Sequence, residues 1–136
     1  MSLLTVEPPI IYESICTKLL QNKGLNFVGI VNNKGRIIAG QLGKIYTKFE
    51  DKNELEMFLM EIALEFSMKR EFNSKFGIVE YVFSKRRSGN ILCIPINEAI
   101  LIIISESYIG PGIILEKCIA VLETNFKDGN DVNESL

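Results

Sequence analysis

The stretch LNFVGIVNNKGRIIAG, residues 25–40, decides the fold prediction. Its two apolar runs, Leu25–Val31 and Arg36–Gly40, are rich in β-forming residues, and the polar segment Asn32–Gly35 lies between them. Asparagine and glycine readily adopt the positive φ angles that a hairpin turn requires. The stretch therefore predicts a β-hairpin, and it is the clearest hairpin signal in the chain.

The predicted elements around this hairpin follow from apolar spacing and turn residues. In chain order they are a helix over Pro9–Gln21, the hairpin, a long helix over Lys52–Glu71, strands over Ile78–Ser84, Ile91–Ile96 and Ala99–Ser105, and a last helix after Gly110-Pro111-Gly112. Pro95 falls near the end of the fourth strand. We expect a bulge or the end of the strand there, because proline cannot donate a hydrogen bond to a sheet ladder.

The order of these elements is α-β-β-α-β-β-β-α, with short connections between most of the strands. Such an order predicts an α+β domain in which helices cover a five-stranded antiparallel sheet. We expect one domain over residues 1–126. The segment 127–136 is polar and lacks aromatic residues, so a frayed C-terminal tail is expected there.

The composition is that of an ordinary folded protein and argues against several functional classes. The chain has 136 residues, of which 47% are hydrophobic, and its formal net charge is −2. A protein that binds nucleic acids or anionic membranes in general would carry a basic surface. No apolar run reaches the length of about eighteen residues that a membrane span requires. We therefore expect a cytoplasmic protein that binds no nucleic acid and does not insert into membranes.

The residues that usually carry chemistry are scarce. Cys16, Cys93 and Cys118 are far apart and each lies in an apolar run, which predicts buried free thiols in a reducing compartment. Histidine, the most common general base and metal ligand, does not occur. The phosphate-binding patterns G-x-G-x-x-G and G-x-x-x-x-G-K-[ST] do not occur either. We therefore predict no enzyme activity, no cofactor and no metal site.

The long predicted helix is apolar on two sides. At about 100° per residue, the stripe that includes Leu55, Leu59 and Phe66 suits the sheet. A second stripe falls on nearly the opposite side, and its members are Met57, Met60, Leu64 and Met68. Another helix of the same chain could cover it, or the side chains could simply be exposed. Because a surface helix normally presents charged residues to water, we expect a contact with another protein instead.

The third predicted strand, Ile78–Ser84, offers a second candidate contact. If it lies at the edge of the sheet, Val79, Tyr81 and Phe83 line an open pairing site, and two such edges could join across a two-fold axis. The basic turn Lys85, Arg86 and Arg87 follows directly. That turn is either a solvated hairpin tip or a contact for an acidic partner.

Parts of this sequence resemble the roadblock/LC7 family, whose fold is close to those of profilin and longin domains. The best local match is Phe27–Val31 followed by Asn33–Ala39, a glycine turn between apolar strands. The last predicted hairpin is also similar, and the resemblance extends over residues 10–126. It implies a homodimer formed by the second helix and the third strand, whose counterparts here hold the residues singled out above. The unusually long second helix and Pro95 depart from the family pattern.

The resemblance implies a function as well as a fold. In the family, homodimers serve as platforms for small GTPases, motor complexes or other signalling proteins. Our first hypothesis is therefore a non-catalytic homodimeric adaptor or small-GTPase regulator. A PAS- or GAF-like sensor of small molecules and a longin-like trafficking module are the alternatives. A sensor pocket would need convergent polar groups inside it, and the predicted core strands contain few.

Overall fold

The computed structural model describes residues 8–40 and 48–134. Residues 1–7 of the predicted domain and the last two residues of the predicted tail lie outside the described residues. The elements are α2 (Pro8–Leu20), β1 (Leu25–Val31), β2 (Ile37–Gly40), α3 (Lys52–Arg70), α4 (Asn73–Phe76), β3 (Val82–Ser84), β4 (Asn90–Ile96), β5 (Ala99–Ser105) and α5 (Pro111–Glu134).

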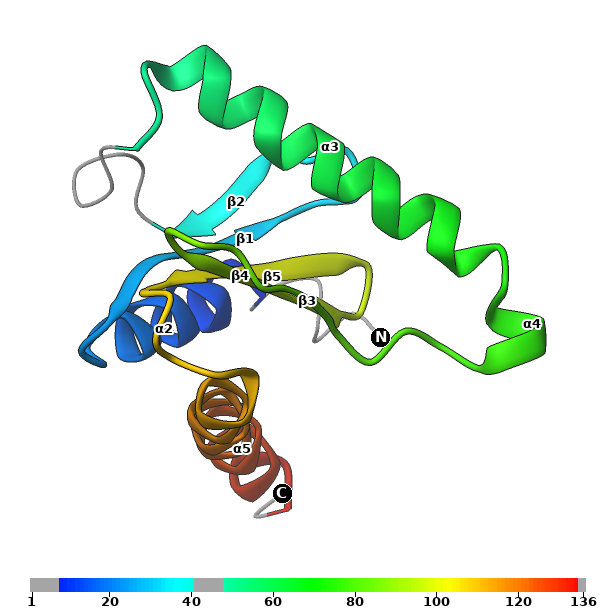
Figure 1. Cartoon of the computed structure of the whole chain (residues 1–136). Helices are drawn as coiled ribbons and strands as arrows, with labels where there is room; N and C mark the ends of the chain where they lie inside the picture. Colours follow the sequence, from blue (N-terminus) through cyan, green and yellow to red (C-terminus); the bar gives the residue numbers. More distant parts are fainter. Residues whose placement is uncertain (1–7, 41–47, 135–136) are drawn as a thin grey trace.

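The strands form one five-stranded sheet in the order β2-β1-β5-β4-β3, and all neighbours are antiparallel. This confirms the predicted α+β class and sheet. Helix α3 covers one face of the sheet, whereas α2 and α5 cover the other (Figure 1). The fold therefore has three layers. The layer formed by α2 and α5 lies on the side of the sheet away from α3. It therefore does not cover the outer side of α3.

The sheet divides the buried side chains into two clusters. The cluster beneath α2 and α5 includes Ile15, Leu19 and Ile114, which are fully buried. The cluster beneath α3 includes Leu59 and Phe66 from the helix, together with side chains of β1, β4 and β5. Strand β5 is buried along its whole length and contributes to both clusters. It was predicted over the same residues because its apolar run is continuous, as in a strand covered on both faces.

The β1–β2 turn is built by Asn32 and Gly35. The Oδ1 atom of Asn32 accepts hydrogen bonds from the backbone N–H groups of Lys34 (2.9 Å) and Arg36 (3.0 Å). Gly35 has a φ of +83° and lies against α3, where a Cβ atom at this position would be 2.6 Å from the Cα of Met60. The turn needs glycine for its backbone conformation and for this close approach to the helix.

Pro95 neither bulges nor ends its strand, contrary to the prediction. The β4–β5 register continues through the Pro95↔Ile100 pair to Ile96↔Ala99. Two residues join β4 and β5, so Ile96 and Ala99, which flank them, form a hydrogen-bonded pair. The backbone groups of successive strand residues point to opposite neighbours, so the nitrogen of Pro95 points toward β3. Proline has no N–H to donate there. This explains why the β3–β4 ladder stops at Val82↔Cys93.

Strand β3 is consequently much shorter than the predicted Ile78–Ser84. The backbone over residues 77–81 forms no ladder, and α4, which was not predicted, precedes it. The regular hydrogen bonding of α3 gives way to short-span bonds at its end, where Glu71 N–H donates to Met68 O and Phe72 N–H to Lys69 O. The chain bends there, and α4 projects beyond the strands (Figure 1).

The last helix extends into the segment that was predicted as a tail. Helix α5 continues to Glu134 and so includes most of the segment 127–136 for which a frayed tail was expected. The division into a domain over 1–126 and a tail remains a prediction. None of the helices in the described part of the chain combines the length and the apolar character needed to cross a membrane.

Candidate interaction surface

Helix α3 carries apolar side chains on two opposite sides, as predicted. Five of its residues are buried toward the sheet, namely Leu55, Leu59, Ile62, Ala63 and Phe66. The second stripe is open to solvent: the exposed fractions are 70% for Met57, 56% for Met60, 61% for Leu64 and 58% for Met68. We call these four residues the outer stripe. No other part of the described chain covers them.

The first turn of α3 shows why the helix begins where it does. The side chain of Asp51 accepts a hydrogen bond from Glu54 N–H at 2.9 Å, and Glu54 Oε1 accepts one from Glu50 N–H at 3.0 Å. These bonds satisfy backbone donors that no helical carbonyl can reach. The acidic residues at this end therefore cap the helix, and their presence needs no catalytic explanation.

The neighbours of α3 fix the direction in which the outer stripe points. On the side of β2, Gly35 lies against the helix backbone at Leu59 and Met60. On the side of β3, Glu61 and Glu65 line a cleft of about 190 Å³ whose other residues include Val82 and Arg86. The outer stripe lies between these sides, roughly 160° around the helix from the buried residues at 100° per residue. It therefore points away from the sheet.

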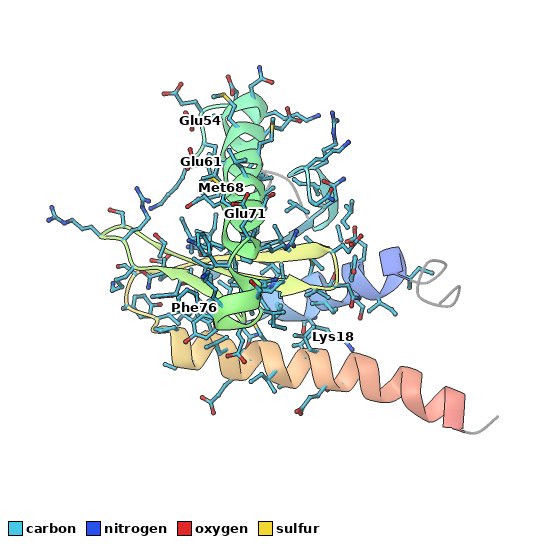
Figure 2. The ribbon with its side chains drawn as sticks, turned by 90° about the vertical axis from the view of Figure 1, so that its right-hand side faces the viewer. Lys18, Glu54, Glu61, Met68, Glu71 and Phe76 are labelled. Atoms are coloured by element: carbon cyan, nitrogen blue, oxygen red, sulfur yellow. The ribbon has the colours of Figure 1, made fainter. Side chains whose placement is uncertain are left out.

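The acidic side chains of α3 separate the outer stripe from β3. Glu54, Glu61 and Glu65 follow one another along this side of the helix, and we call them the acidic flank. All three are exposed. Figure 2 shows Glu54, Glu61 and Met68 along α3, on the side of the sheet opposite α5. The outer stripe and β3 are thus two surfaces, with a charged strip between them.

Strand β3 lies at the edge of the sheet, as the pairing hypothesis requires. The predicted common face of Val79, Tyr81 and Phe83 is wrong, however. Val79 packs against the cluster beneath α3, whereas Phe83 packs against the cluster on the other side of the sheet. The strict alternation of a strand does not hold, because residues 77–81 are irregular. Of the three side chains, Tyr81 is the most exposed, at 45%.

Three exposed apolar residues next to this edge were not singled out from the sequence. Phe72 is 53% exposed, Phe76 84% and Ile78 76%. They lie in α4 and its flanking segments, where no regular spacing marks a face. Figure 2 shows Phe76 at the end of α4 that leads toward β3. The alternation of apolar and polar residues after position 76 was the one sequence signal available, and it suggested a strand.

The basic turn is partly used inside the chain. Lys85 Nζ donates a hydrogen bond to Ser107 O at 2.8 Å, which ties the turn to the segment before α5. Asn90 is fully buried, accepts from Arg86 N–H and donates to the carbonyls of Ser107 and Ile109. Sequence reasoning began the next strand at Ile91 and missed this role of Asn90. An acidic partner remains a prediction for the exposed side chains of Arg86 and Arg87.

The cysteines are free and buried in the structure, as predicted. Burial raises the pKa of Cys16, Cys93 and Cys118 to about 12 in each case, because a thiolate loses its hydration in an apolar interior. In Cys16 and Cys93 a nearby carboxylate adds to this rise, from Glu13 and Glu65 respectively. These thiols are packing groups, since a reactive cysteine requires an accessible thiolate.

A binding pocket for a small molecule would have to use one of the surface clefts. The cleft between α3 and the basic turn has a volume of about 530 Å³, and its lining includes Phe58, Glu61, Arg86 and Arg87. Three of these four side chains are exposed, whereas small-molecule sites usually bury most of their ligand. Within residues 8–40 and 48–134, no three Cys, Asp or Glu residues gather as a metal site would require.

Solved structures confirm the resemblance at the level of the fold. A roadblock/LC7 domain from Streptomyces avermitilis has a TM-score of 0.65 at 10% identity, over 82% of this chain and 92% of that one. Myxococcus xanthus MglB has a TM-score of 0.66 at 15% identity, over 90% and 92%. A profilin from Schizosaccharomyces pombe scores 0.59 at 14% identity, over 87% and 98%. The chain therefore has a roadblock/LC7 fold, related to that of profilin.

Comparison by sequence identifies the family of the chain. No curated protein matches the chain. One family model matches residues 8–128, which span every described helix and strand except the last turns of α5. By this match, the chain belongs to the family described as "Family of unknown function (DUF6659)".

Proposed function

We propose that this protein is a non-catalytic module that associates with copies of itself and serves as a platform for a further protein. The observation that carries the proposal is the outer stripe, four large apolar side chains in a row, each more than half exposed. The opposite side of the same helix is already buried against the sheet. Fully burying a leucine or methionine is worth roughly 1.5–3 kcal/mol, so covering this stripe would stabilise an association substantially.

The stripe fits a protein contact better than a solvated helix face. Three of its four members are methionines, whose flexible thioethers adapt to a partner surface. Met57 and Met68 lie about three turns apart, and Met60 and Leu64 lie between them. A contact of this length matches another helix. Self-association of the second helix is also what the roadblock fold implies.

The further protein that we propose is a small GTPase, as the roadblock resemblance implies. The basic turn supplies a charged surface outside the outer stripe, since the side chains of Arg86 and Arg87 are exposed. A platform of this kind needs no catalytic residues of its own. Longin-like trafficking modules would bind protein partners in a similar manner, so the identity of the client must come from binding measurements.

The self-association is tested by the mass in solution. Light scattering of the purified protein at micromolar concentration should give a mass above that of one chain. Replacing Met60 and Leu64 together by glutamate should lower the mass, because two carboxylates would be buried without partners. The matched control is Ile113→Glu on α5, where the side chain is 52% exposed; it should leave the mass unchanged. A wild-type mass equal to one chain would contradict the proposal.

The GTPase partnership needs a separate experiment. A small GTPase encoded beside the gene would be purified and titrated with this protein by calorimetry, once with GDP bound and once with a non-hydrolysable GTP analogue. We expect binding that differs at least tenfold between the two nucleotide states. Arg86→Ala with Arg87→Ala should weaken it, whereas Lys75→Ala, an exposed cation on α4, should not. Equal or absent binding in both states would contradict this part of the proposal.

A further inference from the structure

The cleft between α3 and the basic turn combines an apolar interior with a cationic rim. Its apolar lining includes Phe58 of α3, Ile91 of β4 and Ile104 of β5. Ile104 is buried, and Phe58 and Ile91 are half-buried. The basic turn contributes Arg86 and Arg87, whose side chains are exposed. A ligand that fills the cleft would therefore contact apolar side chains in its interior and positive charge at its rim.

The segment before α3 adds an aromatic pair to this cleft. Phe49 lies against Phe58, with the ring centroids 5.2 Å apart and the ring planes inclined by 48°. Both rings also pack against the cluster beneath α3. Lys48 Nζ donates a hydrogen bond to Ser88 O, which ties this segment to the residue after the basic turn. The tilted rings offer a broad surface on which an apolar or aromatic side chain can pack.

Further hydrogen bonds hold the backbone of the basic turn in place. Lys85 Nζ donates to Ser107 O at 2.8 Å. Arg86 N–H donates to Oδ1 of the buried Asn90 at 3.1 Å. The guanidinium groups of Arg86 and Arg87, by contrast, pair with no carboxylate in the part of the chain that the structure describes. A fixed backbone that carries unpaired charges is preorganised for a ligand, because binding then orders few further groups.

The cleft continues along α3 toward β3. It has a volume of about 530 Å³ and adjoins the cleft of about 190 Å³, and four residues line both, namely Phe58, Glu61, Arg86 and Ile91. A groove of this extent suits a short extended peptide. Glu61 belongs to the α3 wall, whereas both arginines belong to the turn. The carboxylates of a bound peptide would therefore lie toward the turn.

The acidic flank narrows the class of ligand further. Glu61 and Glu65 line the groove on the side of α3, and Glu54 extends the same charged side of the helix. Nucleic acids and anionic membranes spread negative charge over a wide surface, so this flank would repel them. A peptide can instead confine its carboxylates to the neighbourhood of the two arginines. The charges of the groove therefore favour a peptide over either of these polyanionic partners.

We infer that this groove binds an acidic peptide segment that carries one large apolar side chain. The apolar side chain packs against Phe58 and Ile91, and the neighbouring carboxylates bind Arg86 and Arg87. Bonds between arginine and carboxylate are stronger than neutral hydrogen bonds, and a desolvated apolar anchor typically supplies the centre of a protein contact. The inference rests on the proposed platform function, since the client supplies the segment, and it specifies how that client is recognised.

Synthetic peptides test the inference on the full chain by fluorescence anisotropy. The probe is a short peptide of aspartate and glutamate with a central phenylalanine. One control peptide has alanine in place of phenylalanine, and the other has lysine in place of the acidic residues. The probe should bind the wild type at least about tenfold more tightly than either control, because only the probe provides both the apolar anchor and the carboxylates.

Variants at the rim test the role of charge. Arg86→Glu with Arg87→Glu should abolish binding of the probe. Lys34→Glu with Lys75→Glu changes the net charge equally at exposed positions outside the groove, and at physiological salt it should retain binding, because distant surface charges are screened. Glu61→Gln should tighten binding several-fold, since it removes a carboxylate that repels those of the probe.

Variants in the interior test the apolar anchor. Phe58→Ala should remove the preference for the phenylalanine peptide over the alanine peptide. Phe76→Ala, which removes a phenylalanine that is 84% exposed on α4, should keep that preference. Circular dichroism confirms that each variant is folded. The comparison of the two peptides on the wild type tests the same anchor without any change to the chain.

Three results would overturn the inference. Equal binding of the phenylalanine and alanine peptides would show that the arginines act only as a charged surface. Equal binding of the acidic and lysine peptides would show that the arginines take no part. A probe that does not bind would exclude the site, and the self-association and GTPase measurements, which use no peptide, would be unaffected. Failure of the GTPase titration alongside the expected probe binding would overturn only the proposed client and would support the peptide site.

Discussion

The two sides of the sheet are covered in different ways. On one side, α2 and α5 pack on the sheet and on each other, so a single cluster joins both helices to the strands. On the other side, α3 lies alone and packs through one stripe of buried residues. Its far side carries the outer stripe, whereas exposed apolar and charged residues alternate over residues 113–123 of α5. A lone helix with two apolar sides is an incomplete layer, and this difference locates the proposed contact.

The largest expected effects come from removing one large core side chain on each side. Phe66 beneath α3 is 2% exposed, and Leu19 of α2 is fully buried. Phe66→Ala should lower the free energy of unfolding by about 4 kcal/mol and Leu19→Ala by about 3 kcal/mol. Urea denaturation at a fixed protein concentration measures both. A cost below about 1 kcal/mol for Phe66→Ala would show that α3 is not firmly packed on the sheet.

The buried cysteines on the two sides of the sheet should make the stability of the fold depend on pH. Each thiol has its pKa raised from 9.0 to about 12 by burial. A raised pKa stabilises the fold fully below pH 9, and that stability is lost as the pH rises toward 12. Between pH 8 and 10, Cys16 and Cys118 beneath α2 and α5 should together account for a loss of about 3 kcal/mol, and Cys93 beneath α3 for roughly half of that.

Cysteine-to-alanine variants separate these contributions from the titration of lysines and tyrosines. Urea denaturation at pH 8 and pH 10 should show that Cys16→Ala with Cys118→Ala removes about twice as much of the pH dependence as Cys93→Ala. An equal pH dependence in all variants would mean that the thiols ionise as readily in the folded protein as in the unfolded chain.

The substitution Gly35→Ala tests how much the β1–β2 turn supports the position of α3. Gly35→Ala should cost about 2 kcal/mol or more, because alanine disfavours a φ of +83° and its Cβ would approach the backbone of Met60 and Leu59. Gly77 is the matched control, since it has the same φ and a Cβ added there would meet no heavy atom within 4 Å. Gly77→Ala should cost less than Gly35→Ala, because only the backbone conformation of Gly77 (φ 83°, ψ 177°) disfavours alanine and no clash is added. Equal losses of unfolding free energy in the two variants would show that the turn does not support α3.

The smallest expected effect is on the outer side of α3. Met57 is 70% exposed, so Met57→Gln should change the unfolding free energy of a dilute, dissociated sample by less than about 0.5 kcal/mol. Leu59→Ala, on the buried side of the same helix, should cost about 3 kcal/mol. If Met57→Gln were as costly as Leu59→Ala in dilute samples, the stripe would serve the fold of the single chain, and the proposed contact would lose its basis.

The sequence predicted the features that local pattern controls. The β1–β2 hairpin, β5 and both sides of α3 could be located because their apolar spacing or turn residues are continuous in the chain. The features that were missed depend on distant residues. Pro95 of β4 determines where β3 ends, so the alternation of apolar and polar residues after Ile78 wrongly predicted a strand there. Asn90 is buried because it binds carbonyls of Ser107 and Ile109, and Lys85 is engaged by Ser107. No spacing within either segment reveals such partners.

The central claim, that another copy of the chain covers the outer side of α3, can be measured at the methionines themselves. The chain contains four methionines, and Met57, Met60 and Met68 belong to the outer stripe. Mass spectrometry would follow the peroxide oxidation rate of each at increasing protein concentrations. We predict that the three rates fall several-fold over the concentrations at which the mass rises above that of one chain. Rates that stay constant while the mass rises would contradict the claim, because the copies would then meet elsewhere.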